Sequence, residues 1–252
     1  MSVVIDSFPS SDKRYFSDYA IVAVDVIRAS TTAITAAAMG RRCLPVASVD
    51  EALEKRREFP DCLLAGEVAG FMPEGFDLNN SPSSLALRSD YHRPLVLLSS
   101  SGTKLMVQSS AVANTYVGCL RNYQAVASHI AGCHERIAVL GASTHGEFRE
   151  EDQLCCAWIA VELAQLGHTP ENLSTLALME QWGNASLHAC ACGNSAAYLR
   201  RSGQVNDLNF ILSHVNDVPA AFQLAYGELM PAGVSNIVKE RQPVATPGSL
   251  AA

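Results

Sequence analysis

The sequence lacks the features that define several broad classes of protein. It has no run of basic residues, and 25 acidic against 18 basic side chains give a formal net charge of −7, so a nucleic-acid partner is not expected. No apolar run reaches the roughly 18 residues of a membrane span, and the first residues show no signal-peptide pattern. We therefore expect a cytoplasmic protein that contacts neither nucleic acid nor a membrane.

Cysteine pairs with metal-ligand spacing are also missing. The eight cysteines are scattered along the chain, none of them forms a CxxC pair, and most lie in apolar stretches. Free structural thiols in a reducing compartment are the simplest interpretation of this pattern.

Apolar and amphipathic segments instead alternate regularly over most of the 252 residues. This alternation predicts an α/β fold, a three-layer α/β/α arrangement with a mixed, mainly parallel sheet. No internal repeat or clear linker interrupts it. We expect residues 1–240 to form one α/β domain, either undivided or in two lobes, and residues 241–252 to form a disordered tail.

The expected elements follow from hydrophobic periodicity and from proline and glycine signals. Strands are predicted at 3–8, 20–26, 43–47, 62–65, 94–99, 113–117 and 136–140. Helices are predicted at 33–39, 50–59, 82–88, from 103, at 122–130 and at 151–166. The segment from there to about residue 212 is also predicted to be mainly helical. Residues 218–229 fit a helix and a strand equally well.

The most informative segment is 21–40. Its apolar run ends at Asp25, Arg28 follows three residues later, and hydroxyl residues at 30–32 precede an alanine-rich stretch closed by Gly40. This order predicts a strand, a short loop and a helix, with a carboxylate, a guanidinium and a helix N-terminus at one sheet edge. A helix N-terminus attracts anions. A carboxylate beside it would repel an anion unless a cation lay between the two. The pattern therefore favours a phosphate site bridged by a metal ion.

Polar loops follow four of the expected strands. Ligands of open α/β sheets bind beyond the carboxyl ends of strands, so these loops are predicted to line one site. The loops are residues 25–32, 66–82, 99–104 and 141–152.

Each of these loops also has a structural interpretation. Arg28 could form an ion pair with Asp25 alone, and Glu67 could be a solvated loop acid. Residues 79–81 and 99–103 could cap helices, and the acids between 147 and 152 suit any helix start. In the fourth loop, His145 could be a general acid or base, or simply a polar surface residue.

Several segments, in their order along the chain, carry a resemblance to a known family. They are Asp25-Val26-Ile27-Arg28-Ala29-Ser30-Thr31-Thr32, Gly66-Glu67, Gly75-Phe76-Asp77-Leu78-Asn79-Asn80-Ser81-Pro82, Ser101-Gly102-Thr103, Gly146-Glu147, Glu151-Asp152 with Cys155, Asp207-Leu208 and Asp217-Val218-Pro219. Together they resemble the 2-phosphosulfolactate phosphatase (ComB-type) family. The family usually has Asn where this chain has Ser101, and Gly where it has Asn79.

The resemblance implies a Mg²⁺-dependent phosphatase that converts 2-phosphosulfolactate to sulfolactate and phosphate. The expected metal ligands are Asp25 with one or more of Glu67, Glu147 and Asp152, and the expected catalytic residues are Asp25, Arg28 and Glu67. The expected substrate-binding residues are Arg28, Ser30, Thr31, Asn79, Asn80, Ser81, Ser101, Gly102, Thr103 and Lys104.

Three questions stay open at this point. Asp25 could be a metal ligand, a base or a nucleophile, although Val24-Asp25-Val26-Ile27 lacks the second Asp of the usual Asp-x-Asp signature of aspartyl-phosphate phosphatases. The substrate could be a different small phosphorylated carboxylic acid. The chain could also be a non-catalytic binding protein for anionic metabolites. The only macromolecular partner that we expect is a second copy of the chain, in a homodimer.

Overall fold

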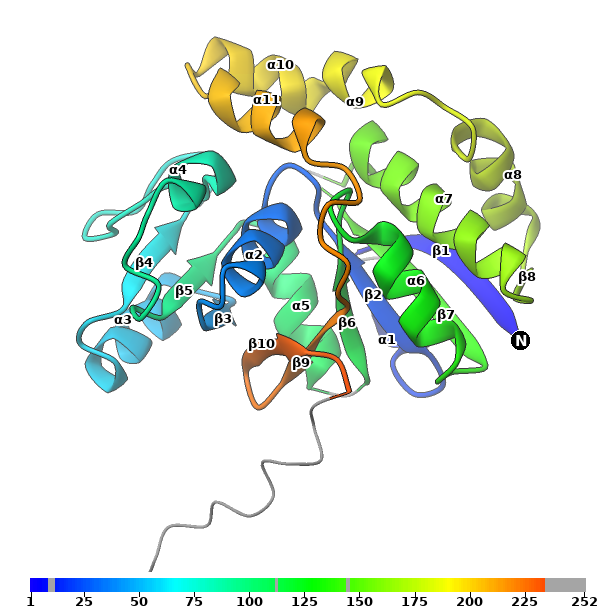
Figure 1. Ribbon diagram of the computed structural model, residues 1–252, viewed down its shortest axis with the longest axis horizontal. Helices are drawn as coiled ribbons and strands as arrows, with labels where there is room; N and C mark the ends of the chain where they lie inside the picture. Colours follow the sequence, from blue (N-terminus) through cyan, green and yellow to red (C-terminus); the bar gives the residue numbers. More distant parts are fainter. Residues whose placement is uncertain (9–11, 112, 144–145, 234–252) are drawn as a thin grey trace, which may run out of the picture.

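Strands and helices alternate along the chain in the computed structural model (Figure 1), which describes residues 1–8, 12–111, 113–143 and 146–233. The predicted tail at 241–252 and His145 lie outside these residues. The strands are β1 (Ser2–Phe8), β2 (Ala20–Val24), β3 (Cys43–Val46), β4 (Leu63–Gly66), β5 (Leu95–Leu98), β6 (Thr115–Gly118), β7 (Arg136–Ala142), β8 (Thr169–Pro170), β9 (Phe222–Ala225) and β10 (Glu228–Pro231).

The helices differ more in length than the strands do. They are α1 (Asp12–Tyr15), α2 (Ala29–Ala38), α3 (Val49–Glu58), α4 (Pro82–Ala86), α5 (Gly102–Ser110), α6 (Tyr123–Ala131), α7 (Glu150–Gln165), α8 (Leu173–Trp182), α9 (His188–Cys192), α10 (Asn194–Arg201) and α11 (Val205–Ser213). No helix in the described part of the chain is long and apolar enough to cross a membrane.

The described strands form two sheets. The larger has the order β10-β9-β6-β2-β7-β1-β8, and the smaller has the order β3-β5-β4. All pairs are parallel except β6 with β9 and β9 with β10, which are antiparallel. The prediction of a mixed, mainly parallel sheet is confirmed, although the strands are divided between two sheets.

Successive side chains of β2 point to opposite faces of the larger sheet, and both faces are buried. Ile21 and Ala23 join a buried cluster with residues of α2, α5 and the smaller sheet, whereas Val22 and Val24 join another with residues of α6 and α7. Helices α2 and α5 therefore lie between the two sheets (Figure 1), and α6 and α7 cover the outer face. This arrangement confirms the three-layer α/β/α prediction.

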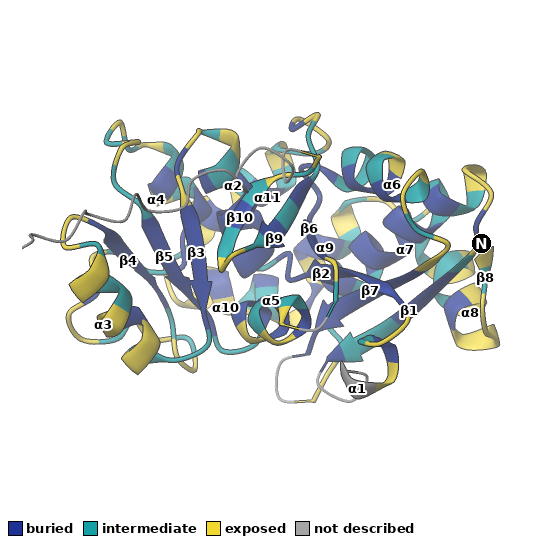
Figure 2. Ribbon diagram, turned by 90° about the horizontal axis from the view of Figure 1, so that it is seen from below, coloured by how far each residue is buried: buried dark blue, intermediate teal, exposed yellow. Residues whose placement is uncertain are grey.

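Helix α3 packs against the face of the smaller sheet that points away from α2 and α5. Ala52 is the buried residue of this helix and lies against Leu64 and Val96. Figure 2 shows the strands of both sheets as mostly buried and α3 as mostly exposed. Arg42 and Glu228 form an ion pair of 2.8 Å between the β3 and β10 sides of the two sheets. That residues 1–240 form a single domain stays a prediction.

Helix α1 and strand β8 were not predicted, and two further segments differ from the sequence-based prediction or complete it. The ambiguous segment 218–229 contains β9 and the start of β10, joined by Tyr226 and Gly227, which both have positive φ as a tight hairpin turn requires. Helix α2 begins at Ala29 rather than at residue 33, and the predicted stop, Gly40, has a φ of +74°.

Candidate active site

A cavity of about 950 Å³ lies where the predicted loops meet. It is bordered by the residues that follow β2, β3, β4 and β5, by the segment that leads into α7, and by one side of α10. The predicted site residues that line it are Asp25, Arg28, Glu67, Asn80, Ser101, Lys104 and Glu147. Strand ends and a helix that is distant in the sequence thus form one concave site.

Asp25 lies directly after β2 and is 9% exposed. A Cβ atom on Gly102 would overlap its carboxylate, so a glycine at the first position of α5 is what lets the two approach. Burial raises the pKa of Asp25 to about 7, against a backbone hydrogen bond from Ala29 that lowers it. The carboxylates of Glu67 and Glu151 raise this pKa further, and Arg28 opposes them.

Two more buried acids lie behind Asp25, in the first turn of α7. The Oδ1 atom of Asp152 accepts a hydrogen bond of 2.7 Å from the backbone N–H of Val26, so Asp152 anchors the turn after β2. Glu151 is 1% exposed, and its Oε2 atom has no hydrogen-bond partner among the described residues. Burial raises the pKa of both carboxyl groups, and the charge of Asp25 raises that of Asp152 further.

Glu67 joins two of the loops. Its carboxylate accepts hydrogen bonds from the Ser100 backbone N–H at 2.7 Å, the Ser100 hydroxyl at 2.8 Å and the Gly70 backbone N–H at 2.7 Å. The loop after β4 is therefore held to the loop after β5. Glu67 also lines the cavity, so its carboxylate has a structural role and a place in the site.

Arg28 does not pair with Asp25 as the structural interpretation expected. Its Nη1 atom donates to Asp207 at 2.6 Å and to Gln204 at 2.5 Å, and its Nη2 atom donates to Asn79 at 3.3 Å. Asp207 belongs to α11, so the predicted anion-binding arginine is held from the C-terminal helices.

Three of the predicted hydroxyl groups are engaged with the protein itself. Ser30 donates to the carbonyl of Asp25 at 2.7 Å, and Thr31 donates to that of Val26 at 2.8 Å. Thr103 accepts from the backbone N–H of Ser99 at 2.8 Å. These contacts fix the loops around the cavity, and direct substrate binding by these hydroxyls stays a prediction.

Residues 79–81 have different roles: Ser81 caps a helix, and Asn80 borders the cavity. Ser81 caps α4 and donates to Asp207 at 2.6 Å, and Asn79 accepts from the backbone of Asn80 at 2.7 Å. Asn80 is 2% exposed and lines the cavity. The capping interpretation thus describes Ser81, and Asn80 is the member of the segment that borders the cavity.

The four predicted metal ligands do not form one compact cluster. Glu147 is largely exposed and pairs with Arg149 at 2.5 Å, and Asp152 points to the backbone of Val26. Among the residues that the structure describes, no three side chains of His, Cys, Asp or Glu are grouped so as to hold a metal ion. Mg²⁺ commonly takes one or two carboxylates and fills its other positions with water and substrate oxygens, so Asp25 with Glu67 remains a suitable donor set.

Several residues on the cavity wall were not predicted from the sequence. Arg149, Arg201 and Tyr198 line it, and the Tyr198 hydroxyl donates to the carbonyl of Gly70 at 2.9 Å. Helix α10 is thereby tied to the loop after β4. The resemblance of Asp207-Leu208 to the family was the one signal that the C-terminal helices contribute to the site.

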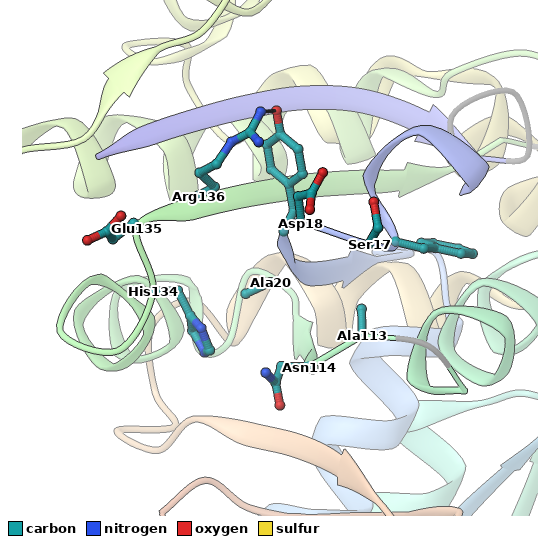
Figure 3. Close-up of a pocket in the computed structure, with 10 residues that line it drawn as sticks. Ser17, Asp18, Ala20, Ala113, Asn114, His134, Glu135 and Arg136 are labelled. Carbon is teal, nitrogen blue, oxygen red and sulfur yellow. Dashed lines mark hydrogen bonds between the residues drawn. The ribbon is translucent and has the colours of Figure 1, made fainter.

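A second cavity lies at the opposite edge of the larger sheet (Figure 3). It measures about 560 Å³ and is lined by residues next to the starts of β2, β6 and β7, among them Asp18, Asn114 and Glu135. Arg136, which also lines it, pairs with Glu171 at 3.1 Å. The amino-terminal edge is not where ligands of parallel sheets usually bind.

The fold and the first cavity define an α/β protein with a cavity lined by acidic and basic side chains at the carboxyl ends of its strands. The chain belongs to the 2-phosphosulfolactate phosphatase family. The sequence model of the family described as "2-phosphosulpholactate phosphatase" matches residues 7–220.

Individual relatives agree with this assignment. A probable 2-phosphosulfolactate phosphatase of Deinococcus radiodurans is 32% identical over 240 residues, which are 92% of this chain and 97% of that protein. One of Caldanaerobacter subterraneus subsp. tengcongensis is 27% identical over 82% of this chain and 89% of that protein. One of Clostridium acetobutylicum is 33% identical over 55% of this chain and 60% of that protein.

Proposed function

We propose that this protein is a Mg²⁺-dependent phosphoric monoester hydrolase that converts 2-phosphosulfolactate to sulfolactate and phosphate. The observation that carries this proposal is the buried carboxylate of Asp25 at the end of β2, on the wall of a cavity that also contains Arg28 and Lys104. Membership of the family and the names of the relatives support the reaction and the substrate.

The charges of the cavity suit this substrate. 2-Phosphosulfolactate carries a phosphate, a sulfonate and a carboxylate, so an acidic protein must offer it local positive charge. Four cationic side chains line the cavity: Arg28, Lys104, Arg149 and Arg201. Arginine can donate two parallel hydrogen bonds to a phosphate or sulfonate, which fixes the orientation of the anion as well as its position.

The donor atoms near Asp25 fit Mg²⁺. Carboxylate oxygens are the hard ligands that this ion prefers, and Asp25 and Glu67 both line the cavity. Burial raises the pKa of Asp25 to about 7, and the charges of Glu67 and Glu151 raise it further. A bound cation would favour the ionised form of this carboxylate. Asp25 and Glu67 would hold the ion, which would supply charge neutralisation for the phosphate and orientation for an attacking water.

The residues of the chain itself would position the phosphate for in-line attack. Arg28 and the loop with Ser101 and Lys104 line the same cavity and would bind the phosphate or sulfonate oxygens. Asp25 lies on the wall of this cavity, where it would serve as metal ligand, base or nucleophile. All three roles need an ionised carboxylate at this position.

A panel of substrates tests the proposed specificity. We expect phosphate release from 2-phosphosulfolactate in the presence of Mg²⁺, and release from a phosphorylated carboxylic acid of similar size within about two orders of magnitude in kcat/KM. A clear preference for the carboxylic acid would change the substrate and keep the reaction. Binding of either acid without any phosphate release would favour the non-catalytic alternative and contradict the proposal.

A further inference from the structure

Arg28 and Asp207 form the most deeply buried of the ion pairs in the described part of the chain. Their side chains are 4% and 3% exposed, and the Nη1 and Oδ2 atoms lie 2.6 Å apart. Arg28 precedes α2 and Asp207 belongs to α11, so the pair joins two segments that are far apart in the sequence. A buried charge pair of this kind holds its geometry only when its remaining hydrogen-bonding capacity is satisfied.

The second oxygen of Asp207 is satisfied at the start of α4. Its Oδ1 atom accepts from the Ser81 hydroxyl at 2.6 Å, from the Ser83 hydroxyl at 2.5 Å and from the Ser83 backbone N–H at 3.1 Å. The carboxylate is therefore fixed on both oxygens. It has little freedom to follow any movement of Arg28.

The guanidinium of Arg28 is held by two further acceptors. Gln204 accepts from its Nη1 atom at 2.5 Å, and Asn79 accepts from its Nη2 atom at 3.3 Å. Gln204 and Asn79 also bond to each other at 3.2 Å. Both Nη1 protons and one Nη2 proton are thus used, which leaves the Nε–H and the other Nη2–H for a ligand.

We propose that Asp207 is a positioning residue that acts through Arg28, and that it aims the guanidinium at one anionic group of the substrate. This inference rests on the proposed function, because it assigns Arg28 to the substrate. Arg28 lines the cavity and Asp207 does not, so the carboxylate lies behind the arginine. The C-terminal helices are then part of the binding site rather than only a cover over it.

A double-mutant cycle on kcat/KM tests this role. Arg28→Lys and Asp207→Asn should each lower kcat/KM by roughly ten-fold or more, since charged hydrogen bonds are lost or misdirected. The double variant should lose little more than either single variant, because both changes remove the same interaction. Two results would overturn the proposal. One is independent effects that multiply to a loss of about a hundred-fold in the double variant, and the other is an unchanged kcat/KM in an Asp207→Asn variant that folds normally.

A matched control separates positioning from stability. Asp217 holds Arg121 through Nε at 3.0 Å and Nη2 at 2.7 Å, in an ion pair that does not line the cavity. Asp217→Asn should lower the melting temperature and leave KM and kcat unchanged. If Asp207→Asn does not fold, Gln204→Ala replaces it in the cycle, because half-buried Gln204 bonds to the same Nη1 atom.

The same cycle on the Kd of inorganic phosphate, measured by calorimetry, is independent of turnover. Non-additive changes in phosphate affinity support the link between Asp207 and Arg28 even if the wild-type protein hydrolyses no phosphate ester. Additive changes refute the link even if the protein is an active phosphatase. The proposed function and the positioning role can therefore fail separately.

Discussion

Asp25 links the stability of the protein to its proposed chemistry. The pKa of this carboxyl group is raised from 3.8 to about 7, mainly by burial. The folded state therefore binds the proton more tightly than the unfolded state does. The contribution of Asp25 to stability is highest below about pH 4, where its carboxyl group is protonated in both states. This contribution falls as the pH rises towards 7, by an amount on the order of a few kcal/mol.

Asp25→Asn should therefore stabilise the metal-free protein at high pH while it removes activity. In EDTA at pH 8 the variant should melt at a higher temperature than the wild type, because a buried charge is gone. At pH 4 the two should melt alike. Turnover should fall by orders of magnitude at either pH where the wild type is active. Thermal unfolding at both pH values checks this, and a variant that is less stable at pH 8 contradicts it.

Glu67 and Glu147 provide a matched comparison of the other predicted metal ligands. Glu67 is held by two loops, whereas the side chain of Glu147 is 63% exposed. Glu67→Gln should lower kcat/KM by about ten-fold or more and raise the Mg²⁺ concentration needed for half-maximal rate, and Glu147→Gln should change both by less than about three-fold. A Mg²⁺ titration of each variant measures this, and the reverse order would assign the metal to Glu147.

Ser101 bears on the choice between a sulfonate and a carboxylate. It lines the cavity, and the resemblance to the family implies Asn at this position. Ser101→Asn restores an amide donor and a longer reach, so it should widen the ratio of kcat/KM for 2-phosphosulfolactate over a phosphorylated carboxylic acid, by up to about ten-fold. An unchanged ratio would mean that position 101 only shapes the turn before α5.

At the scale of elements, the contact between β2 and α5 depends on one glycine. Gly102→Ala would push a methyl group into the Asp25 carboxylate. We expect a loss of roughly ten-fold or more in kcat/KM, because a small displacement of a reacting group is costly. Gly132→Ala is the control, since its Cβ would have no neighbour closer than 3.9 Å and φ is −81°. Equal effects of the two substitutions would show that Asp25 tolerates the displacement.

The strand and helix on either side of Asp25 were predictable because local signals agree there. The apolar run of β2 and the positive φ at Gly40 match the prediction. The hydroxyls at 30–32 were expected to precede and cap the helix, but they lie inside α2, whose N-cap is Arg28. The role of α11 was not predictable in the same way. Asp207 and Gln204 lie among the polar residues of a helical segment, where a solvated face gives the same pattern, and only the fold brings them to Arg28.

At the scale of the molecule, the sequence predicted a mainly parallel sheet but not its division in two. Strand content follows from local periodicity, whereas strand order depends on pairings such as β2 with β6 and β3 with β5, between residues far apart in the chain. The predicted loops still meet at one cavity, because the carboxyl ends of parallel strands lie at the same edge. The helical cover over this cavity could not be inferred from those loops.

The most direct measurement for the central claim is the initial rate of phosphate release from 2-phosphosulfolactate as Mg²⁺ is titrated, with wild-type protein and Asp25→Asn side by side. We expect no release by the wild type in EDTA, a saturable rise with Mg²⁺, and a rate for Asp25→Asn lower by orders of magnitude at every concentration. Equal rates in EDTA and in Mg²⁺, or a fully active Asp25→Asn variant, would contradict the account.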